Sequence, residues 1–160
     1  MSFAPAPAPT LALRWEALSL NTLDALLEVE QQAYSHPWSR GNFIDALASG
    51  YHCQLLWADN HLLGYTIAMR GVQEAHLLNI TVAPTHQGQG WARVLLEHLA
   101  LWARSEQAQC LWLEVRTSNA RALSIYTAHG YQRVGLRKRY YPAADGARED
   151  AIVMQLPLWP

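Results

Sequence analysis

One segment of the chain joins an apolar, strand-like run to an amphipathic helix through a turn that contains two glycines. The run ends at Val82, the turn carries Gly88 and Gly90, and apolar residues recur at helical spacing between Gly90 and Gln107. A short apolar run, Cys110 to Val115, follows the helix closely. A helix between two neighbouring strands is the connection that a parallel pair requires. The segment therefore predicts an α/β fold that contains a parallel pair of strands.

The same turn is suited to bind a phosphate group. Helix N-termini carry unpaired N–H groups and a partial positive charge, and Gly88 and Gly90 remove side chains where a ligand must approach the backbone. No Lys-Ser or Lys-Thr pair follows the glycines, which excludes a nucleoside-triphosphate loop. The three-glycine spacing of dinucleotide sites is also missing. A plain strand-to-helix turn remains the alternative hypothesis.

The remaining segments add strands and helices around this unit. Ser39 and Asn119 are the expected caps of two helices, either Ser19 or Asn21 caps the first helix, and Gly130 ends the last one. The expected strands are 11–17, 51–58, 62–70, 74–82, 110–115, 131–140 and 151–156, and the expected helices are 21–34, 40–49, 90–107 and 120–129. This order describes a single α/β sheet.

Composition narrows the class of protein and its partners. The 160 residues suit one domain with a full core, 11–160, behind a Pro/Ala-rich tail, 1–10, that we expect to be disordered. The net charge is −1 and no apolar stretch is long enough to span a bilayer, so we expect neither nucleic-acid nor membrane binding. Cys53 and Cys110 stand in strand-like runs, and the seven histidines lack metal-ligand spacing. We therefore expect a cytoplasmic protein without disulfides or a metal.

Two side chains, Glu114 and Tyr126, are candidates for proton transfer. Glu114 interrupts an otherwise apolar run, where the loss of hydration makes a carboxylate a better proton acceptor. The pattern alone favours a simpler hypothesis, in which Glu114 meets solvent or pairs with Arg116. Tyr126 lies seven residues after Asn119 on one side of the expected helix, where its phenol either donates a proton or only packs. Both alternatives stay open on the pattern alone.

Several short strings of residues occur in the order shared by one superfamily. They are His36-Pro37-Trp38-Ser39, Leu111 to Arg116, Ser118-Asn119-Ala120, Tyr140-Tyr141-Pro142, Asp145-Gly146 and Glu149 to Ile152. Residues 87–92, Gln-Gly-Gln-Gly-Trp-Ala, match that superfamily's pyrophosphate signature of Gln or Arg, two residues, Gly, one residue, and Gly or Ala. With these strings the chain resembles the GNAT N-acetyltransferase superfamily and, within it, the bacterial ribosomal-protein alanine N-acetyltransferases of the RimI type. The resemblance covers nearly everything after the Pro/Ala tail.

The resemblance implies a mixed, mainly antiparallel sheet flanked by about four helices, in an enzyme that uses acetyl-CoA and no metal. It implies transfer of the acetyl group to the N-terminal alanine of a small-subunit ribosomal protein. We expect direct transfer within a ternary complex, because neither cysteine lies in a recognisable nucleophile setting. Glu114 would be the base and Tyr126 the acid, and Trp38, Tyr140 and Tyr141 would contact the substrate. The residues implied to bind the cofactor are Ile80, Thr81, Val82, Gly88, Gln89, Gly90, Trp91, Ala92, Arg93 and Asn119.

Two positions depart from the superfamily's pattern. Gly88 stands where relatives often place a basic residue, so one phosphate contact is missing. Trp91 is bulky at a variable position and could reshape the entrance of the pocket. Neither change removes the backbone N–H groups on which such a site mainly depends.

Two other functions remain open. The acceptor could be a lysine side chain or a small amine. A lysine, with a pKa of about 10.4, demands a stronger base than an α-amino group at about 7.7–8.0. The chain could also be an acyl-CoA-binding module without turnover, which the presence of both Glu114 and Tyr126 disfavours.

Overall fold

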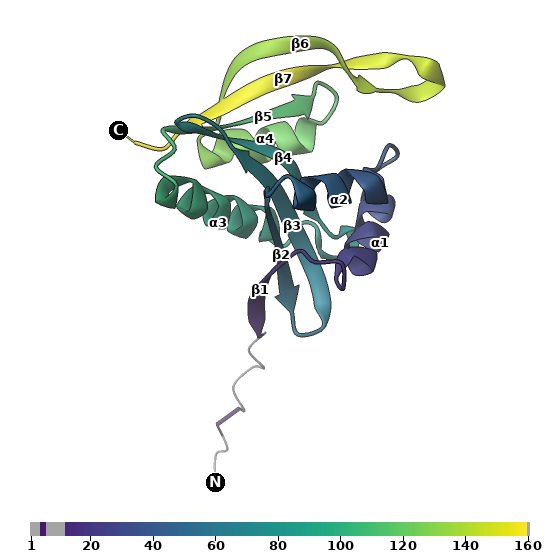
Figure 1. Cartoon of the computed structure of the whole chain (residues 1–160), viewed down its shortest axis with the longest axis vertical. Helices are drawn as coiled ribbons and strands as arrows, with labels where there is room; N and C mark the ends of the chain where they lie inside the picture. The colour runs from purple at the N-terminus through teal and green to yellow at the C-terminus, as the bar shows by residue number, and fades with distance from the viewer. Residues whose placement is uncertain (1–3, 6–11, 160) are drawn as a thin grey trace.

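The computed structural model describes residues 4–5 and 12–159, and its centre is a seven-stranded sheet in the order β1-β2-β3-β4-β5-β7-β6 (Figure 1). The strands are β1 (Leu13–Ala17), β2 (His52–Ala58), β3 (His61–Arg70), β4 (Glu74–Val82), β5 (Cys110–Arg116), β6 (Gln132–Pro142) and β7 (Arg148–Pro157). The helices are α1 (Leu23–Ala33), α2 (Arg40–Ala48), α3 (Trp91–Ser105), α4 (Ala120–His129) and two short 3-10 helices, η1 (Pro84–His86) and η2 (Ala144–Gly146). Most of the tail expected at 1–10 lies outside the described residues.

Within the described chain, one pair of neighbouring strands is parallel. β4 and β5 run in the same direction and are connected through α3, and every other neighbouring pair is antiparallel. This confirms the parallel pair that the strand–turn–helix–strand segment predicts. The mixed, mainly antiparallel sheet with four α-helices likewise confirms the expected fold class. None of the helices in residues 4–5 and 12–159 is long and apolar enough to cross a membrane.

The sheet opens between β4 and β5. The two strands pair only as far as Leu77 and Leu113; beyond these residues β4 continues along β3, and β5 continues along β7. Opposite this point the register of β3 against β4 shifts between Ile67 and Ala68. An irregularity of this kind bends its strand. The last residues of β4 therefore move away from β5, and each of the two strands keeps one edge without a neighbouring strand.

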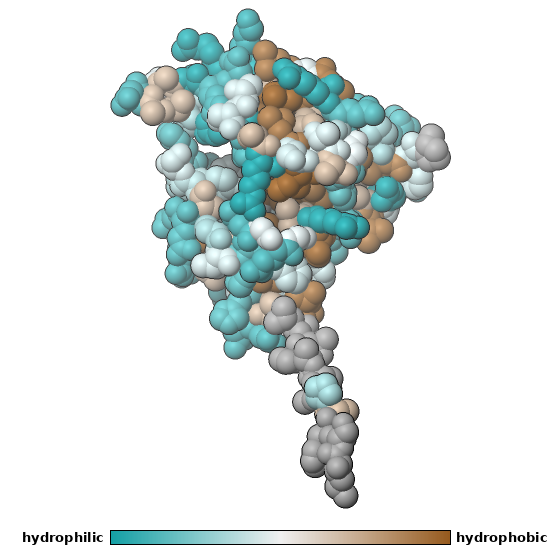
Figure 2. All heavy atoms as spheres, turned by 180° about the vertical axis from the view of Figure 1, so that it is seen from behind, coloured by the Kyte–Doolittle hydropathy of each residue, from teal (hydrophilic) through white to brown (hydrophobic). Residues whose placement is uncertain are grey.

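Helices cover both faces of the sheet. Successive residues of a strand point to opposite faces, and in β2 Leu55 packs with α1 and α2 whereas Leu56 packs with α3. In β5, Leu113 packs with α3 and α4, so Glu114 points to the other side. We call these sides the α3–α4 face and the α1–α2 face. Seen from behind, the molecule shows a band of hydrophobic side chains that hydrophilic residues flank (Figure 2).

Side-chain caps mark where α2 and α4 begin. Ser39 forms a reciprocal capping box at α2, and Asn119 accepts a hydrogen bond from the N–H group three residues further on, at the start of α4. Both caps are those expected. The expected cap of the first helix, Ser19 or Asn21, is wrong, because α1 begins after Thr22. The Thr22 hydroxyl instead exchanges hydrogen bonds with the backbone of Ser19.

Candidate active site

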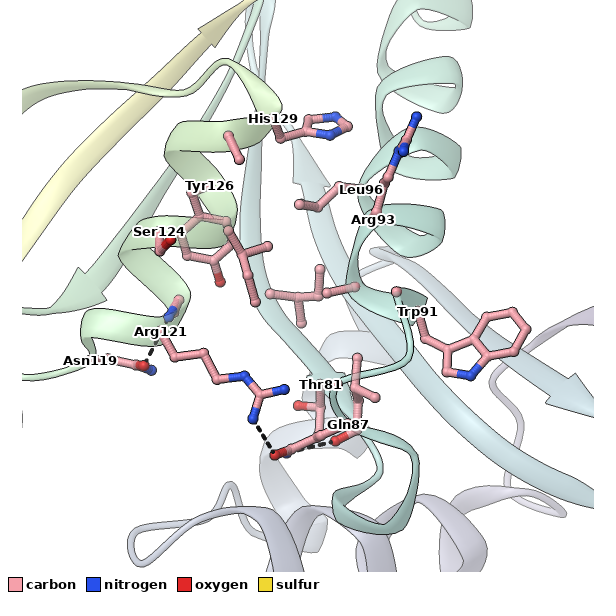
Figure 3. Close-up of a pocket in the computed structure, with 18 of the residues that line it drawn as sticks. Thr81, Gln87, Trp91, Arg93, Leu96, Asn119, Arg121, Ser124, Tyr126 and His129 are labelled. Carbon is pink, nitrogen blue, oxygen red and sulfur yellow. Dashed lines mark hydrogen bonds between the residues drawn. The ribbon is translucent and has the colours of Figure 1, made fainter.

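A cavity of about 1060 Å³ opens on the α3–α4 face (Figure 3). The end of β4 forms one wall, the turn after η1 and the start of α3 form the second, and α4 forms the third. Every residue of the expected cofactor-binding set except Gln89 lines this cavity. The Gln89 side chain instead accepts a hydrogen bond from Trp91 Nε1 at 3.1 Å. The fold therefore gathers in one place residues that the sequence carries in two separate segments.

The turn before α3 presents backbone to the cavity rather than side chains. Gly88 and Gly90 have φ values of 76° and 90°, a left-handed region that residues with a β-carbon rarely adopt. Gly90 is the N-cap residue of α3, and no side chain caps this helix. The first N–H groups of α3 are therefore available to an anion. The indole of Trp91 points away from the centre of the cavity, so its bulk does not fill the site (Figure 3).

Hydrogen bonds that the sequence did not predict join the β4 wall to α1. The Tyr34 hydroxyl lies 2.9 Å from Ile80 O and 2.7 Å from Thr81 Oγ1. Thr81 Oγ1 in turn donates to Asn79 Oδ1 at 2.8 Å. Burial raises the pKa of Tyr34 to about 12, so its phenol stays neutral and remains a donor. Tyr34 also lines the cavity and is therefore a site residue that the motifs missed.

Glu30 is the centre of the same network. It is 1% exposed, and its carboxylate accepts hydrogen bonds from Tyr65 Oη at 2.6 Å and from Asn79 Nδ2 at 3.0 Å. A third bond comes from the backbone N–H of Trp38 at 3.0 Å. These bonds hold α1, the segment before α2 and the end of β4 in a fixed relation. The signal in the sequence is an acidic residue at an apolar position of the first helix.

Glu114 lies outside the cavity, on the α1–α2 face, directly after the last residue of β5 that pairs with β4. Its side chain is 5% exposed. Oε2 of the carboxylate is 2.6 Å from His76 Nε2, and Oε1 is 3.6 Å from Arg137 Nη1. The His76 ring stacks on Trp112 with 3.5 Å between the centroids. The carboxylate is therefore enclosed by groups from three strands, and its partners His76 and Arg137 are absent from the expected site.

Arg116, the alternative partner considered for Glu114, binds elsewhere. Its Nη1 donates to Pro142 O at 2.8 Å and to Glu149 Oε1 at 3.2 Å. Its guanidinium also lies over the ring of Tyr141, 4.5 Å from the centroid. The hypothesis that Glu114 pairs with Arg116 is therefore wrong. The other hypothesis, that Glu114 meets solvent, is also wrong, because its side chain is buried.

Tyr126 projects from α4 into the cavity (Figure 3). Burial raises the pKa of its hydroxyl well above the usual range, and nearby Tyr34 adds to this effect. The phenol is consequently neutral and can donate a hydrogen. Asn119 caps α4 through Oδ1 and lines the same cavity, so the two functions considered for it are compatible.

The three residues expected to contact the substrate do not line this cavity. Trp38 packs on Phe43, with 5.2 Å between the ring centroids, and borders a smaller hollow of about 240 Å³ beside α2. The rings of Tyr140 and Tyr141, both on β6, lie edge to face with 4.9 Å between their centroids. Burial, followed by the nearby charge of Glu114, raises the pKa of Tyr141. The two β6 tyrosines therefore lie near Glu114, apart from the cofactor set.

A helix start without a side-chain cap and a neutral phenol in one cavity suit an enzyme that transfers an acyl group from a phosphate-bearing thioester. The opened sheet and its four α-helices add the architecture of an acetyltransferase. Residues 23–131, more than half of the chain, match the acetyltransferase (GNAT) family. The chain belongs to this family.

Several members of the family resemble the chain over nearly their full length. The [ribosomal protein bS18]-alanine N-acetyltransferase of Salmonella typhimurium is 40% identical over 141 residues, which cover 88% of this chain and 95% of the relative. The crystal structure of the ribosomal-protein-S18-alanine N-acetyltransferase from Escherichia coli has a TM-score of 0.84 and 37% identity, and the match covers 93% of this chain and 96% of that one. A Bacillus subtilis acetyltransferase in complex with CoA shares the fold, with a TM-score of 0.75 and 18% identity over 94% of this chain and 100% of that one.

Proposed function

We propose that this protein is a cytoplasmic N-α-acetyltransferase that moves the acetyl group of acetyl-CoA to the N-terminal alanine of ribosomal protein bS18. The observation that carries the proposed chemistry is the single cavity in which Tyr126 and all but one of the expected cofactor residues meet. The choice of acceptor is supported by the 40% identity to the Salmonella typhimurium relative, whose name specifies that alanine.

The backbone of this chain would hold the cofactor, which supplies the reactive thioester when bound. The N–H groups of residues 88–92 stand at the start of α3, where a pyrophosphate is favoured. Beyond Leu77, β4 pairs with β3 on one side only, so the backbone of residues 80–82 can hydrogen-bond an extended pantetheine arm along its other edge. An N–H of that edge would also stabilise the negative charge that develops on the carbonyl oxygen.

In the transfer step the amine nitrogen forms a bond to the acetyl carbon while the bond from that carbon to sulfur breaks. Glu114 accepts the proton that the amine loses, and Tyr126 donates a proton to the departing thiolate. Because Glu114 is 5% exposed and lies outside the cavity, a water molecule carries the amine proton to it. An α-amino group with a pKa of about 7.7–8.0 is only partly protonated, so the base has a modest task. Orientation of the two reactants lowers the barrier by roughly 7–11 kcal/mol in favourable cases.

The acceptor peptide would approach from the α1–α2 face. The Glu114 side chain points to that side, and Tyr140 and Tyr141 lie near it. The gap between β4 and β5 beyond Leu77 then connects the amine on this side with the thioester on the other. Trp38, held by its N–H bond to Glu30, would border the path of the peptide.

A thiol-release assay tests this function. Acetyl-CoA is incubated with the protein and a short peptide that has the N-terminal sequence of bS18, beginning with a free alanine. The same peptide with a blocked N-terminus is the control. We expect thiol release with the free peptide alone. Release with the blocked peptide would indicate a lysine acceptor, and no release with either peptide would contradict the proposal.

A further inference from the structure

His76 is a buried, titratable residue that none of the steps above uses. It lies on β4 directly opposite Trp112 of β5, one residue before the two strands separate. Its side chain is 10% exposed, and its ring stacks on Trp112 with an angle of 8° between the planes. A ring packed in this way is held in one orientation.

The His76 ring holds one oxygen of the Glu114 carboxylate. A carboxylate that acts as a base only accepts hydrogen bonds, so in the proposed mechanism His76 Nε2 is the donor across the 2.6 Å to Oε2. The other oxygen, Oε1, is buried and accepts no hydrogen bond from the described residues, although Arg137 Nη1 lies 3.6 Å from it. A buried acceptor without a partner points to a functional constraint. Oε1 is thus the oxygen that remains able to take up a proton.

We propose that His76 is a positioning residue for Glu114, an inference that rests on the proposed function. By occupying Oε2, His76 fixes the carboxylate so that Oε1 faces the proton path from the acceptor amine. His76 does not line the cofactor cavity, and its hydrogen bond reaches only Glu114. Its effect on the reaction therefore passes through Glu114 and leaves the binding of CoA unchanged.

Two amide variants separate positioning from packing. In His76→Gln the side-chain amide nitrogen replaces Nε2, whereas in His76→Asn it replaces Nδ1 and stops short of Glu114. We expect His76→Gln to retain most of the wild-type kcat and His76→Asn to lose about tenfold, with the KM for acetyl-CoA unchanged in both. In a Glu114→Gln background the difference between the two variants should disappear, because the group that His76 positions is gone.

Three results would overturn this inference. Equal kcat values for His76→Gln and His76→Asn would contradict a role for the Nε2 bond. An equal loss from His76→Asn in the wild-type and Glu114→Gln backgrounds would show that His76 acts independently of Glu114. Wild-type turnover of Glu114→Gln alone would contradict the proposed base itself, which distinguishes failure of the mechanism from failure of the positioning role.

A second, independent observation concerns Arg121, in the first turn of α4. Its guanidinium reaches across the cavity to the turn before α3: Nη1 donates to Gln87 Oε1 at 3.4 Å, and Nη2 stands 3.6 Å from the position of a β-carbon on Gly88 (Figure 3). The other arginine of the cavity, Arg93, pairs with Glu97 at 2.9 Å. Arg121 forms no ion pair with any residue that the structure describes. It therefore places an uncompensated positive charge beside the turn.

We infer that Arg121 binds the phosphates of CoA, an inference that also rests on the proposed function. Gly88 has no side chain, and Arg121 brings a guanidinium from the opposite wall close to the space that a side chain there would occupy. Guanidinium–phosphate pairs are charge-assisted and can be bidentate, which makes them stronger than neutral hydrogen bonds.

Calorimetric titration with CoA and with pantetheine, which lacks the phosphates, tests this role. We expect Arg121→Ala to weaken the binding of CoA by about tenfold and to leave the binding of pantetheine unchanged. The matched control is Arg133→Ala, which removes the same charge from an exposed position of β6 outside the cavity. Unchanged CoA affinity in Arg121→Ala, or an equal loss for both ligands, would overturn the inference. A wild-type protein that does not bind CoA would contradict the proposed function instead.

Discussion

The two faces of the opened sheet assemble their functional groups in different ways. On the α3–α4 face, the cavity takes nine of its 21 lining residues from the continuous segment 80–93 and offers a ligand mainly backbone at the turn. On the α1–α2 face, Glu114 is enclosed by side chains from β4 and β6, and its own side chain is 5% exposed. The α3–α4 face therefore has an open cavity, whereas the α1–α2 face has a buried cluster of side chains around Glu114.

In the proposed mechanism, this difference separates cofactor binding from proton transfer. A backbone turn binds a phosphate through N–H groups that most sequence changes leave in place. A shielded carboxylate depends on each neighbour that touches it, because the loss of one partner leaves a buried group unpaired. We therefore expect substitutions near Glu114 to change turnover and substitutions along the cavity to change cofactor affinity.

The largest expected effect belongs to Glu114→Gln. Loss of the proton acceptor should lower kcat by roughly 100-fold or more, while the affinity for CoA stays unchanged because Glu114 lies outside the cavity. Steady-state kinetics and calorimetric titration measure the two quantities separately. Glu106→Gln is a matched control, since Glu106 pairs with Arg70 away from both sites. Weaker CoA binding in Glu114→Gln would contradict the assignment of cofactor binding and proton transfer to different faces.

Tyr126→Phe should have the next largest effect. Tyr126 lines the cavity, yet its expected role is proton donation, so kcat should fall by about tenfold to 100-fold with little change in CoA affinity. Tyr131→Phe provides the control, because Tyr131 is a buried phenol that packs 5.8 Å from Tyr126 and does not line the cavity. If both variants lose the same activity, the loss reflects packing and the acid is another group.

A smaller effect concerns the free energy of unfolding and comes from a histidine that packs on α3. Burial, with the charge of nearby His98, lowers the pKa of His52 from 6.5 to about 4, and its ring stacks on Trp102 of α3. Between these pH values the unfolded chain binds a proton that the folded chain excludes, so the free energy of unfolding should fall as the pH drops. The slope from this group is at most about 1.4 kcal/mol per pH unit.

Urea unfolding at several pH values between 7 and 4 measures this slope. The variant His52→Leu should show a weaker dependence on pH, whereas His36→Gln, at an exposed position, should behave as the wild type. The same dependence in His52→Leu and in the wild type would assign the acid sensitivity to other groups.

Local sequence was sufficient for most of the fold. The strand Glu74–Val82 has the bounds that its pattern predicts, and Ser39 caps α2 as expected. The error at α1 arose where Ser19, Asn21 and Thr22 all offer a capping side chain within one short segment. Neighbouring polar residues compete for the same backbone groups, so pattern alone does not rank them.

The two faces also differ in how much of the candidate site could be predicted from the sequence. The turn before α3 is local, so the spacing of Gly88 and Gly90 was enough to predict its place and its backbone conformation. The partners of Glu114 come from distant segments: His76 lies 38 residues away, and Arg137 is on β6. Strand register decides which side chains meet across a sheet, and register was not accessible from the motifs. The hydrogen bonds of Glu30 were not predicted for the same reason, because its partners Tyr65 and Asn79 lie on distant strands.

The central claim is that this protein acetylates an N-terminal alanine, with the cofactor on one face and the proton acceptor on the other. Mass spectrometry of bS18 incubated with acetyl-CoA and the protein tests it most directly. We predict one acetyl group, located on the α-amino nitrogen of the terminal alanine, and its loss with Glu114→Gln. Acetylation confined to lysine side chains, or an unmodified alanine despite the consumption of acetyl-CoA, would contradict the account.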